Sequence, residues 1–287
     1  MKYFNSKTIL ITGGASGIGR LLALKLSRYN VKIILWDIDD ERLKTVATEA
    51  AQNKSDVYAY NCDVTDREKV YETAEKVHSE VGKVDILINN AGVTTGKLFL
   101  DCTDEELLRT MNVNVISHFW TAKAFLPAMF QRNSGHIVTI ASAAGLVGTR
   151  RLTDYSSSKF AAFGFDESLR FEIRKMKKNI STTVVCPYFI DTVMFKGVKT
   201  RFPFILPILK EEYVVARIVK AIGRKKARLI MPRFVYLVWL TRYLPVTWFD
   251  AIVTFFGIDS AMDTFTGREN LTTNTARHSD NSKDNTN

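Results

Sequence analysis

Cysteine is scarce in this 287-residue sequence, which contains only Cys62, Cys102 and Cys186. An odd number of widely separated cysteines excludes a disulfide framework and lacks the paired spacing of a zinc site. We therefore expect reduced cysteines that pack in the interior of a protein from a reducing compartment, and no bound metal.

Long apolar runs are also missing. No run reaches the roughly 18 residues of a membrane span, and the nearest one, residues 234–258, is interrupted by Arg242, Pro245 and Asp250. The first seven residues lead directly into an apolar, β-rich run, without the pattern of a signal peptide. These absences predict a cytoplasmic protein that reaches a membrane only as a peripheral protein.

Acidic residues are rare in one segment only. Between residues 196 and 242 there are twelve lysines and arginines but only two acidic residues, Glu211 and Glu212, so this segment carries the entire net charge of +10. The remaining 240 residues are neutral overall. An excess of positive charge favours an anionic partner. No recognition motif for nucleic acid accompanies the charge, so we expect no nucleic-acid partner.

The basic segment overlaps an aromatic one. Residues 224–256 begin with the basic triplet RKK at 224–226 and continue with aromatic side chains such as Trp239 and Trp248. Basic and aromatic residues together are typical of segments that lie in a membrane interface. Residues 224–256 therefore predict contact with a membrane surface. The alternative is a helical element that covers a substrate pocket or a subunit interface.

Short β-rich apolar runs alternate with segments of helical periodicity, and no internal repeat occurs. The composition, with 46% apolar and 24% charged residues, is that of a globular protein. Strands that alternate with helices predict βαβ units and a parallel sheet with right-handed crossovers. The expected strands are residues 8–12, 31–36, 57–61, 85–89, 136–141, 181–186 and 227–231, and the expected helices are residues 18–26, 40–52, 67–81, 105–131, 154–177 and 211–224.

A glycine-rich loop, residues 12–19 (TGGASGIG), lies between the first expected strand and the first expected helix. Glycines allow the backbone to approach a diphosphate closely, and the helix N-terminus contributes N–H donors and a positive dipole. The loop therefore predicts a dinucleotide site, with a plain structural turn as the alternative. The candidate residues are Gly13, Ser16, Gly17, Ile18 and Gly19.

Asp37 lies at the end of the second expected strand, 18 residues after the last glycine of the loop. A carboxylate at this place accepts hydrogen bonds from a ribose 2′-hydroxyl and repels a 2′-phosphate, which favours NAD over NADP. The alternative role for Asp37 is that of a helix cap, together with Asp39 and Asp40. The candidates for the adenine side, after the third expected strand, are Asp63 and Val64.

Four further motifs follow the glycine-rich loop: NNAG at residues 89–92, Asn114, Ser142, and YSSSK at residues 155–159. The whole set resembles the short-chain dehydrogenase/reductase family, over residues 8–231. The resemblance implies an α/β, doubly wound Rossmann fold with about seven parallel strands flanked by helices, followed here by a C-terminal helical extension. It also implies a homodimer or a homotetramer.

The chemistry explains two of these residue types directly. Tyr155 and Lys159 stand four residues apart, on one face of the expected helix. A lysine cation near a phenol lowers the pKa of the phenol, so that Tyr155 can act as general acid or base. Ser142 can orient the substrate oxygen. The resemblance implies that Lys159 also holds the nicotinamide ribose and that Asn114, rather than Asn112, holds a proton-relay water.

The resemblance extends to residues around the nucleotide. It implies that Asn90 and Gly92 lie beside the adenine ribose, with a structural turn as the alternative role of NNAG. The motif CPYFIDT, residues 186–192, implies that Ile190 and Thr192 bind the carboxamide. Tyr188 replaces the glycine that usually follows the proline, so the backbone approach is expected to differ at this position.

Several stretches, among them HIVTIASAAGLVG, DYSSSKFAAFGF and CPYF, are similar to the retinol dehydrogenase and hydroxysteroid dehydrogenase branch of this family. Members of that branch interconvert lipophilic alcohols and carbonyls at membranes or lipid droplets. The similarity implies an NAD-dependent oxidoreductase for a retinol-like, steroid or long-chain alcohol. The alternatives are an NADP-dependent carbonyl reductase and a non-catalytic, membrane-associated scaffold that binds the cofactor.

These observations divide the chain into three parts. Residues 1–232 form the dehydrogenase domain, in which residues 143–152 and a substrate loop at 189–210 are expected to build an apolar pocket. Residues 233–269 form an apolar and basic C-terminal extension. Residues 270–287 contain mostly small polar and charged residues and are expected to be disordered.

Overall fold

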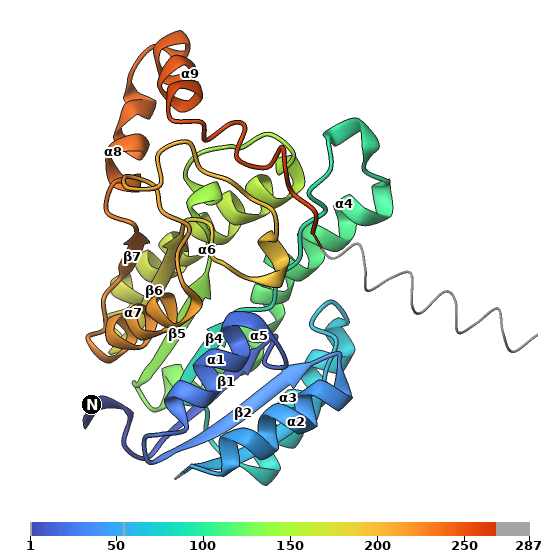
Figure 1. The fold of residues 1–287 in the computed structure, drawn as a ribbon. Coiled ribbons are helices and arrows are strands. Elements are labelled where there is room, and N and C mark those ends of the chain that lie inside the picture. The colour runs from blue at the N-terminus through green and yellow to red at the C-terminus, as the bar shows by residue number, and fades with distance from the viewer. Residues whose placement is uncertain (1, 54, 268–287) are drawn as a thin grey trace, which may run out of the picture.

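The computed structural model describes residues 2–53 and 55–267. Seven parallel strands form one sheet in the order β3-β2-β1-β4-β5-β6-β7, with helices on both faces (Figure 1). The strands are β1 (Lys7–Thr12), β2 (Val31–Asp37), β3 (Asp56–Asn61), β4 (Ile86–Asn89), β5 (Gly135–Ile140), β6 (Ile180–Pro187) and β7 (Arg228–Met231). The α-helices are α1 (Gly17–Leu26), α2 (Asp40–Ala51), α3 (Arg67–Glu80), α4 (Asp104–Met111), α5 (Ser117–Gln131), α6 (Thr153–Lys175), α7 (Glu211–Gly223), α8 (Val235–Leu240) and α9 (Val246–Phe255).

The central strands are apolar on both sides because helices cover both faces of the sheet. In β1, Ile9, Leu10 and Ile11 are all fully buried. Ile9 and Ile11 belong to the core that includes side chains of α1, α2 and α7, whereas Leu10 belongs to the core that includes α3 and α5. The expected doubly wound fold is therefore confirmed. Its strand order reverses between β1 and β4, and ligands of such folds bind at the carboxyl ends of the strands there.

The segment between β4 and β5 differs from the expected uninterrupted helix at residues 105–131. Between α4 and α5 lies a π-helical turn, Asn112–Ile116. Such turns insert an extra residue into a helix and are frequent at functional sites. This turn contains Asn114, whose side chain is completely buried. The other expected strands and helices agree with the structure to within one or two residues at each end.

The C-terminal extension is helical, as expected. α8 and α9 lie beyond the carboxyl end of β7, and the chain then returns across the loop that follows β6 (Figure 1). Two backbone hydrogen bonds fix this return, from Lys199 N to Ala261 O at 3.2 Å and from Thr266 N to Lys196 O at 3.0 Å. The tail expected to be disordered, residues 270–287, lies outside the described residues.

The lengths of the helices show whether any of them could span a membrane. Across the described residues, 2–53 and 55–267, no helix combines the length and the apolar character that crossing a bilayer requires.

The basic triplet at residues 224–226 does not share a surface with the aromatic helices of the extension. It lies in the turn between α7 and β7, where Lys225 Nζ is 5.7 Å from the centre of the Tyr3 ring, at the end of the sheet that carries the N-terminus (Figure 1). α8 and α9 follow the opposite end of β7. Residues 224–256 therefore do not present one continuous surface, because β7 separates the basic triplet from α8 and α9.

Candidate active site

Tyr155 and Lys159 lie in the first turns of α6, on one helical face as expected. Both side chains are buried, with 6% of Tyr155 and 3% of Lys159 exposed. The Lys159 ammonium donates a hydrogen bond to the Ile140 carbonyl at the end of β5 (2.8 Å) and lies 5.5 Å from the centre of the Tyr155 ring. Ser142 follows β5 directly. The carboxyl end of β5 and the start of α6 therefore bring all three predicted side chains together.

Burial sets the protonation states of these groups. Burial raises the pKa of the Tyr155 hydroxyl to about 12, and the Ser142 hydroxyl opposes this rise only in part. Burial also lowers the pKa of Lys159 to about 8. The expectation of a lowered pKa for Tyr155 is wrong in this structure, because desolvation by burial is the largest influence on its hydroxyl. Near neutral pH, Tyr155 is a phenol that can donate a proton, and most of Lys159 carries its charge.

Asn114, and not Asn112, belongs to this cluster. Asn112 is exposed, whereas the Asn114 side chain faces the interior from the π-helical turn. Its Oδ1 accepts from Val93 N (2.8 Å), and its Nδ2 donates to Val93 O (2.9 Å) and to Ser158 Oγ (2.9 Å). The amide thus ties the segment after β4 to α6 beside Lys159.

Gly92 lies between the amide and the lysine. A Cβ at this position would be 3.4 Å from Asn114 Oδ1 and 3.5 Å from Lys159 Nζ. The predicted cofactor residue Gly92 is therefore in contact with the predicted catalytic residues.

Three of the four glycines of the predicted dinucleotide loop have different roles. Gly13 has a φ of +65°, which permits the tight turn after β1. Gly17 also has a positive φ, +49°, and a Cβ there would meet nothing within 4 Å, so its outer side is open. A Cβ on Gly19 would lie 2.0 Å from the Gly13 carbonyl oxygen. These are the roles of a turn, of an open approach for a pyrophosphate, and of close helix packing in dinucleotide-binding loops.

The first turn of α1 can bind an anion. Ser16 occupies the N-cap in an extended conformation, but its side chain makes no capping hydrogen bond. The backbone N–H groups of Gly17, Ile18 and Gly19 are in the first turn and have no carbonyl partner within the helix. Unpaired N–H groups and the helix dipole favour a phosphate at this position. The chain therefore fits the pyrophosphate of NAD or NADP.

Asp37 is not a helix cap. Its Oδ2 accepts from Ala15 N in the glycine-rich loop (2.9 Å) and its Oδ1 accepts from Asp39 N (3.1 Å). The cap of α2 is Asp39, which accepts from Arg42 N. The cap role considered for Asp37 thus belongs to its neighbour, and the Asp37 carboxylate remains beside the loop where a nucleotide ribose would lie.

The remaining candidates for cofactor binding are placed along the carboxyl ends of the strands. Asn90 Nδ2 donates to Thr12 O (2.9 Å) and Gly13 O (3.1 Å), so it holds the glycine-rich loop in place. Asp63 is exposed after β3 and accepts from the backbone and hydroxyl of Thr65.

Three further candidates complete this set. Val64 is buried beside Asp63. Ile190 pairs with Leu209 in an isolated bridge, and Thr192 Oγ1 donates to Ile190 O at 3.5 Å.

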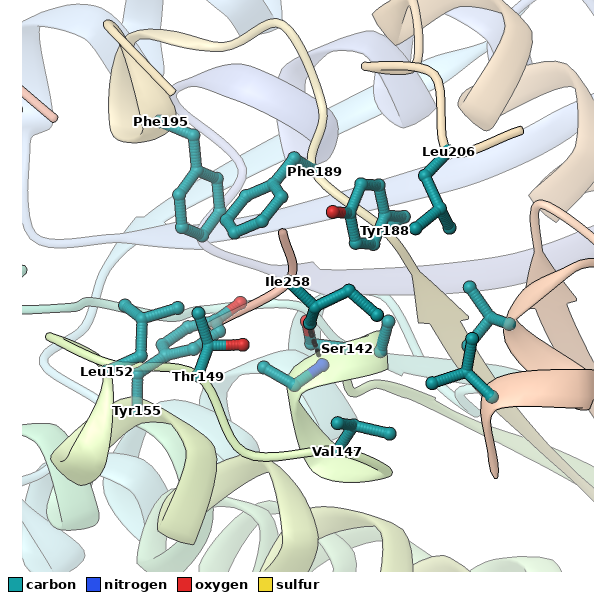
Figure 2. Close-up of a pocket in the computed structure, with 14 residues that line it drawn as sticks. Ser142, Val147, Thr149, Leu152, Tyr155, Tyr188, Phe189, Phe195, Leu206 and Ile258 are labelled. Carbon is teal, nitrogen blue, oxygen red and sulfur yellow. Dashed lines mark hydrogen bonds between the residues drawn. The ribbon is translucent and has the colours of Figure 1, made fainter. Parts of the chain in front are cut away.

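A pocket that is partly open to solvent lies against Ser142 and Tyr155 (Figure 2). The two segments expected to build it, residues 143–152 and 189–210, both contribute. The sequence did not identify Tyr188, Val235, Val238 and Ile258 as wall residues. The apolar side chains of the pocket are Ala143, Ala144, Val147, Leu152, Phe189, Phe195, Leu206, Val235, Val238 and Ile258, and the hydroxyl-bearing ones are Ser142, Thr149, Tyr155 and Tyr188.

The C-terminal extension therefore covers the pocket, which was the alternative to membrane contact. Val235 and Val238 stand three residues apart on α8, a spacing that indicates one helical face. Periodicity could identify the apolar face but not the cavity it lines, because the pocket is closed by residues far apart in the sequence.

Comparison with known proteins agrees with the geometry. The family model of short chain dehydrogenases matches residues 7–201. Short-chain dehydrogenase/reductase family 16C member 6 of Bos taurus is 46% identical over 271 residues, covering 93% of this chain and 86% of that protein. Epidermal retinol dehydrogenase 2 of Homo sapiens is 48% identical over 262 residues, covering 90% of this chain and 84% of that protein.

Solved structures share the fold. A short chain dehydrogenase/reductase from Burkholderia phymatum in complex with NAD has a TM-score of 0.78 at 24% identity, covering 86% of this chain and 96% of that one. An alcohol dehydrogenase from Thermococcus sibiricus complexed with 5-hydroxy-NADP has a TM-score of 0.70 at 26% identity, covering 79% and 96%. The chain belongs to the short-chain dehydrogenase/reductase family, in its retinol dehydrogenase branch, and is an oxidoreductase that acts on CH–OH groups with NAD or NADP.

Proposed function

We propose that the protein interconverts a lipophilic alcohol and its carbonyl with NAD as the cofactor. The observation that carries this proposal is the position of Ser142 and Tyr155 in the wall of an otherwise largely apolar pocket, with Lys159 buried beside them. An apolar wall suits a retinol-like, steroid or long-chain substrate. The names of the retinol dehydrogenase relatives support the same substrate class.

The side chains divide the proton chemistry between them. Ser142 donates a hydrogen bond to the substrate oxygen and orients it. Tyr155 Oη donates a proton to the carbonyl oxygen in reduction, and in its deprotonated form it accepts the proton of the alcohol in oxidation. The nicotinamide supplies or accepts the hydride. Lys159 stabilises the phenolate that proton donation leaves behind, and Asn114 positions the backbone beside Lys159.

Asp37 supports NAD rather than NADP. Its carboxylate lies beside the glycine-rich loop, where a 2′-phosphate would meet a negative charge and a 2′-hydroxyl would find an acceptor. Around it we assign the pyrophosphate to residues 13–19, the adenine side to Asp63 and Val64, and the adenosine ribose to Asn90 and Gly92. The carboxamide is assigned to Ile190 and Thr192.

We also propose that the protein is cytoplasmic and binds a membrane surface peripherally through α8, α9 and the substrate loop. The inner face of α8 lines the pocket, while its outer face is exposed. An exposed apolar patch beside a pocket indicates an interaction surface, and aromatic side chains suit the membrane interface. The exposed side chains are Val193, Phe204, Leu237, Leu240, Tyr243, Val246, Trp248 and Phe255.

A homodimer or homotetramer is proposed on separate grounds. Phe119 on α5 and Phe171 on α6 are 43% and 53% exposed. Large apolar residues exposed on neighbouring helices suit a contact between subunits. Light scattering of the purified protein tests this assignment, because replacement of both residues by serine should yield monomers.

Turnover of retinol and a hydroxysteroid with each cofactor tests the proposed function. Tyr155→Phe removes the proton-transferring hydroxyl and should lower kcat by about 10²–10⁴-fold, while NAD binding persists. The control Tyr213→Phe changes a half-exposed tyrosine on α7 and should leave turnover unchanged. Preference for NADPH and carbonyl substrates would favour the reductase alternative. Cofactor binding without turnover of any alcohol or ketone would favour the scaffold.

A further inference from the structure

The pocket contains two hydroxyl groups that the proposed reaction does not use. Ten of its fourteen wall residues have apolar side chains, and Ser142 and Tyr155 belong to the reaction centre. The other two, Thr149 and Tyr188, are polar groups in a wall that otherwise offers nothing to a substrate oxygen. Figure 2 shows Tyr188 on the wall opposite Tyr155, in a row with Phe189 and Leu206.

The side chain of Tyr188 is held firmly. Tyr188 follows β6, its backbone N–H donates to Met231 O (2.7 Å), and its ring packs edge-on against Phe189 with ring centres 4.9 Å apart. Only 7% of the residue is exposed, and burial raises the pKa of its hydroxyl, which keeps the group a neutral phenol. This is the position at which the sequence motif departs from the usual glycine, and the added side chain lies in the pocket wall.

The Tyr188 hydroxyl has an unmet capacity for hydrogen bonding. Within residues 2–53 and 55–267 no hydrogen bond joins the Tyr188 hydroxyl to another protein group, and its oxygen is not among the polar atoms that the protein encloses completely. The oxygen therefore keeps some accessible surface, and the side chain that carries it lines the pocket. A largely buried hydroxyl without a partner is unfavourable unless something in the pocket satisfies it.

We propose that the substrate carries a second oxygen, remote from the reacting one, which forms a hydrogen bond with Tyr188 Oη. A phenol can donate to a ketone and can also donate to, or accept from, a hydroxyl. The second oxygen is therefore a hydroxyl or a carbonyl. The assigned class is a lipophilic diol or hydroxyketone with oxygens at separate ends of an apolar frame, as opposed to an alcohol with a hydrocarbon tail.

This inference rests on the proposed function and is tested with matched substrates. Full-length protein is assayed with NAD and two steroid alcohols that differ only in a second oxygen at the far end of the skeleton. We expect kcat/KM to be at least about tenfold higher for the compound with two oxygens, because a site built to bind a hydroxyl disfavours an analogue that lacks it. Tyr188→Phe should remove this preference by lowering kcat/KM for the compound with two oxygens. The control is Tyr213→Phe.

Ligand-induced thermal shifts with the same two steroids and NADH give a readout that does not require turnover. The compound with two oxygens should raise the melting temperature of the wild type more than that of Tyr188→Phe. Equal effects of Tyr188→Phe on both steroids, or no effect on either, would overturn the inference while turnover upholds the proposed function. Absence of turnover with a retained difference in binding would instead reject the proposed reaction and keep the second-oxygen site.

Discussion

At the scale of single residues, burial decides which protonation states the proposed catalytic side chains adopt. Lys159 is buried beside Tyr155 and donates to the Ile140 carbonyl, so the same desolvation that raises the pKa of the phenol lowers that of the ammonium. The sequence showed which residue types meet, because i and i+4 positions share a helical face. It could not show the sign of the pKa change for Tyr155, which depends on how completely water is excluded from both groups.

The pH dependence of carbonyl reduction follows from these two groups. With a pKa of about 12, Tyr155 stays protonated through the neutral and mildly alkaline range, whereas Lys159 loses its charge above its pKa of about 8. We expect kcat/KM for reduction to be level near neutral pH and to fall by up to about tenfold per pH unit above about pH 8. Lys159→Arg keeps a charge at all these pH values, so its residual activity should lack this fall. A wild-type rate that stays level to pH 10 would contradict the assignment.

The proposed preference for NAD over NADP rests on one carboxylate. Asp37→Ala removes the negative charge that a 2′-phosphate would meet, while Asp39→Ala removes only the cap of α2. Because juxtaposed like charges cost several kcal/mol, the ratio of kcat/KM for NAD to that for NADP should fall on the order of 10²-fold in Asp37→Ala. Steady-state rates with both cofactors measure the ratio. A comparable change in Asp39→Ala would indicate that disturbance of the loop, and not charge, sets the preference.

At the scale of elements, the glycine-rich loop could be predicted from the sequence, whereas the π-helical turn could not. The loop was recognised because its glycines stand between a strand and a helix, and the structure assigns a separate steric reason to Gly13, Gly17 and Gly19. The π-helical turn at residues 112–116 was not recognised, because a single inserted residue hardly changes a periodic pattern of apolar positions. Its effect is local: it turns Asn114 inward and leaves Asn112 exposed.

Glycine substitutions test the loop at this scale. A Cβ on Gly19 would lie 2.0 Å from a backbone oxygen, so Gly19→Ala should lower the free energy of unfolding by more than about 2 kcal/mol. Gly164, in the middle of α6, is the control, because a Cβ there meets nothing within 4 Å. Gly164→Ala should raise the free energy of unfolding by about 0.5–1 kcal/mol. Urea denaturation measures both, and equal values for the two variants would contradict the packing role of Gly19.

At the scale of the whole molecule, the sequence predicted the sheet better than the surfaces. The alternating strands and helices could be predicted from the sequence because both sheet faces are buried and the strands are apolar throughout. The sequence predicted only those parts of the pocket wall that residues close together in the chain form. The C-terminal extension adds Val235, Val238 and Ile258 to the pocket wall. The distance between the basic triplet and the aromatic helices depends on the direction of β7, which lies between them. Such relations arise from the assembled sheet and leave no local pattern.

The separation of these two surfaces gives a prediction for membrane binding. Combined Leu240→Glu and Trp248→Glu substitutions place charges on the exposed apolar face of α8 and α9 and should lower binding to anionic vesicles by at least about tenfold. Neutralisation of Arg224, Lys225 and Lys226 should change vesicle binding far less, because this triplet lies at the other end of the sheet. Vesicle sedimentation distinguishes the two. A larger loss from the triplet would contradict the proposed surface.

The return of residues 257–267 across the loop after β6 has a consequence for biosynthesis. The glycine-rich loop, Asp37 and the Tyr155–Lys159 pair are complete once the first six strands have been translated, but Ile258 and the bonds to Lys196 and Lys199 form only when the last part of the chain leaves the ribosome. Because chains fold from the N-terminus during synthesis, the nucleotide half can form first and the substrate half closes last. A nascent chain arrested near residue 232 should therefore retain a nucleotide but not a lipophilic alcohol.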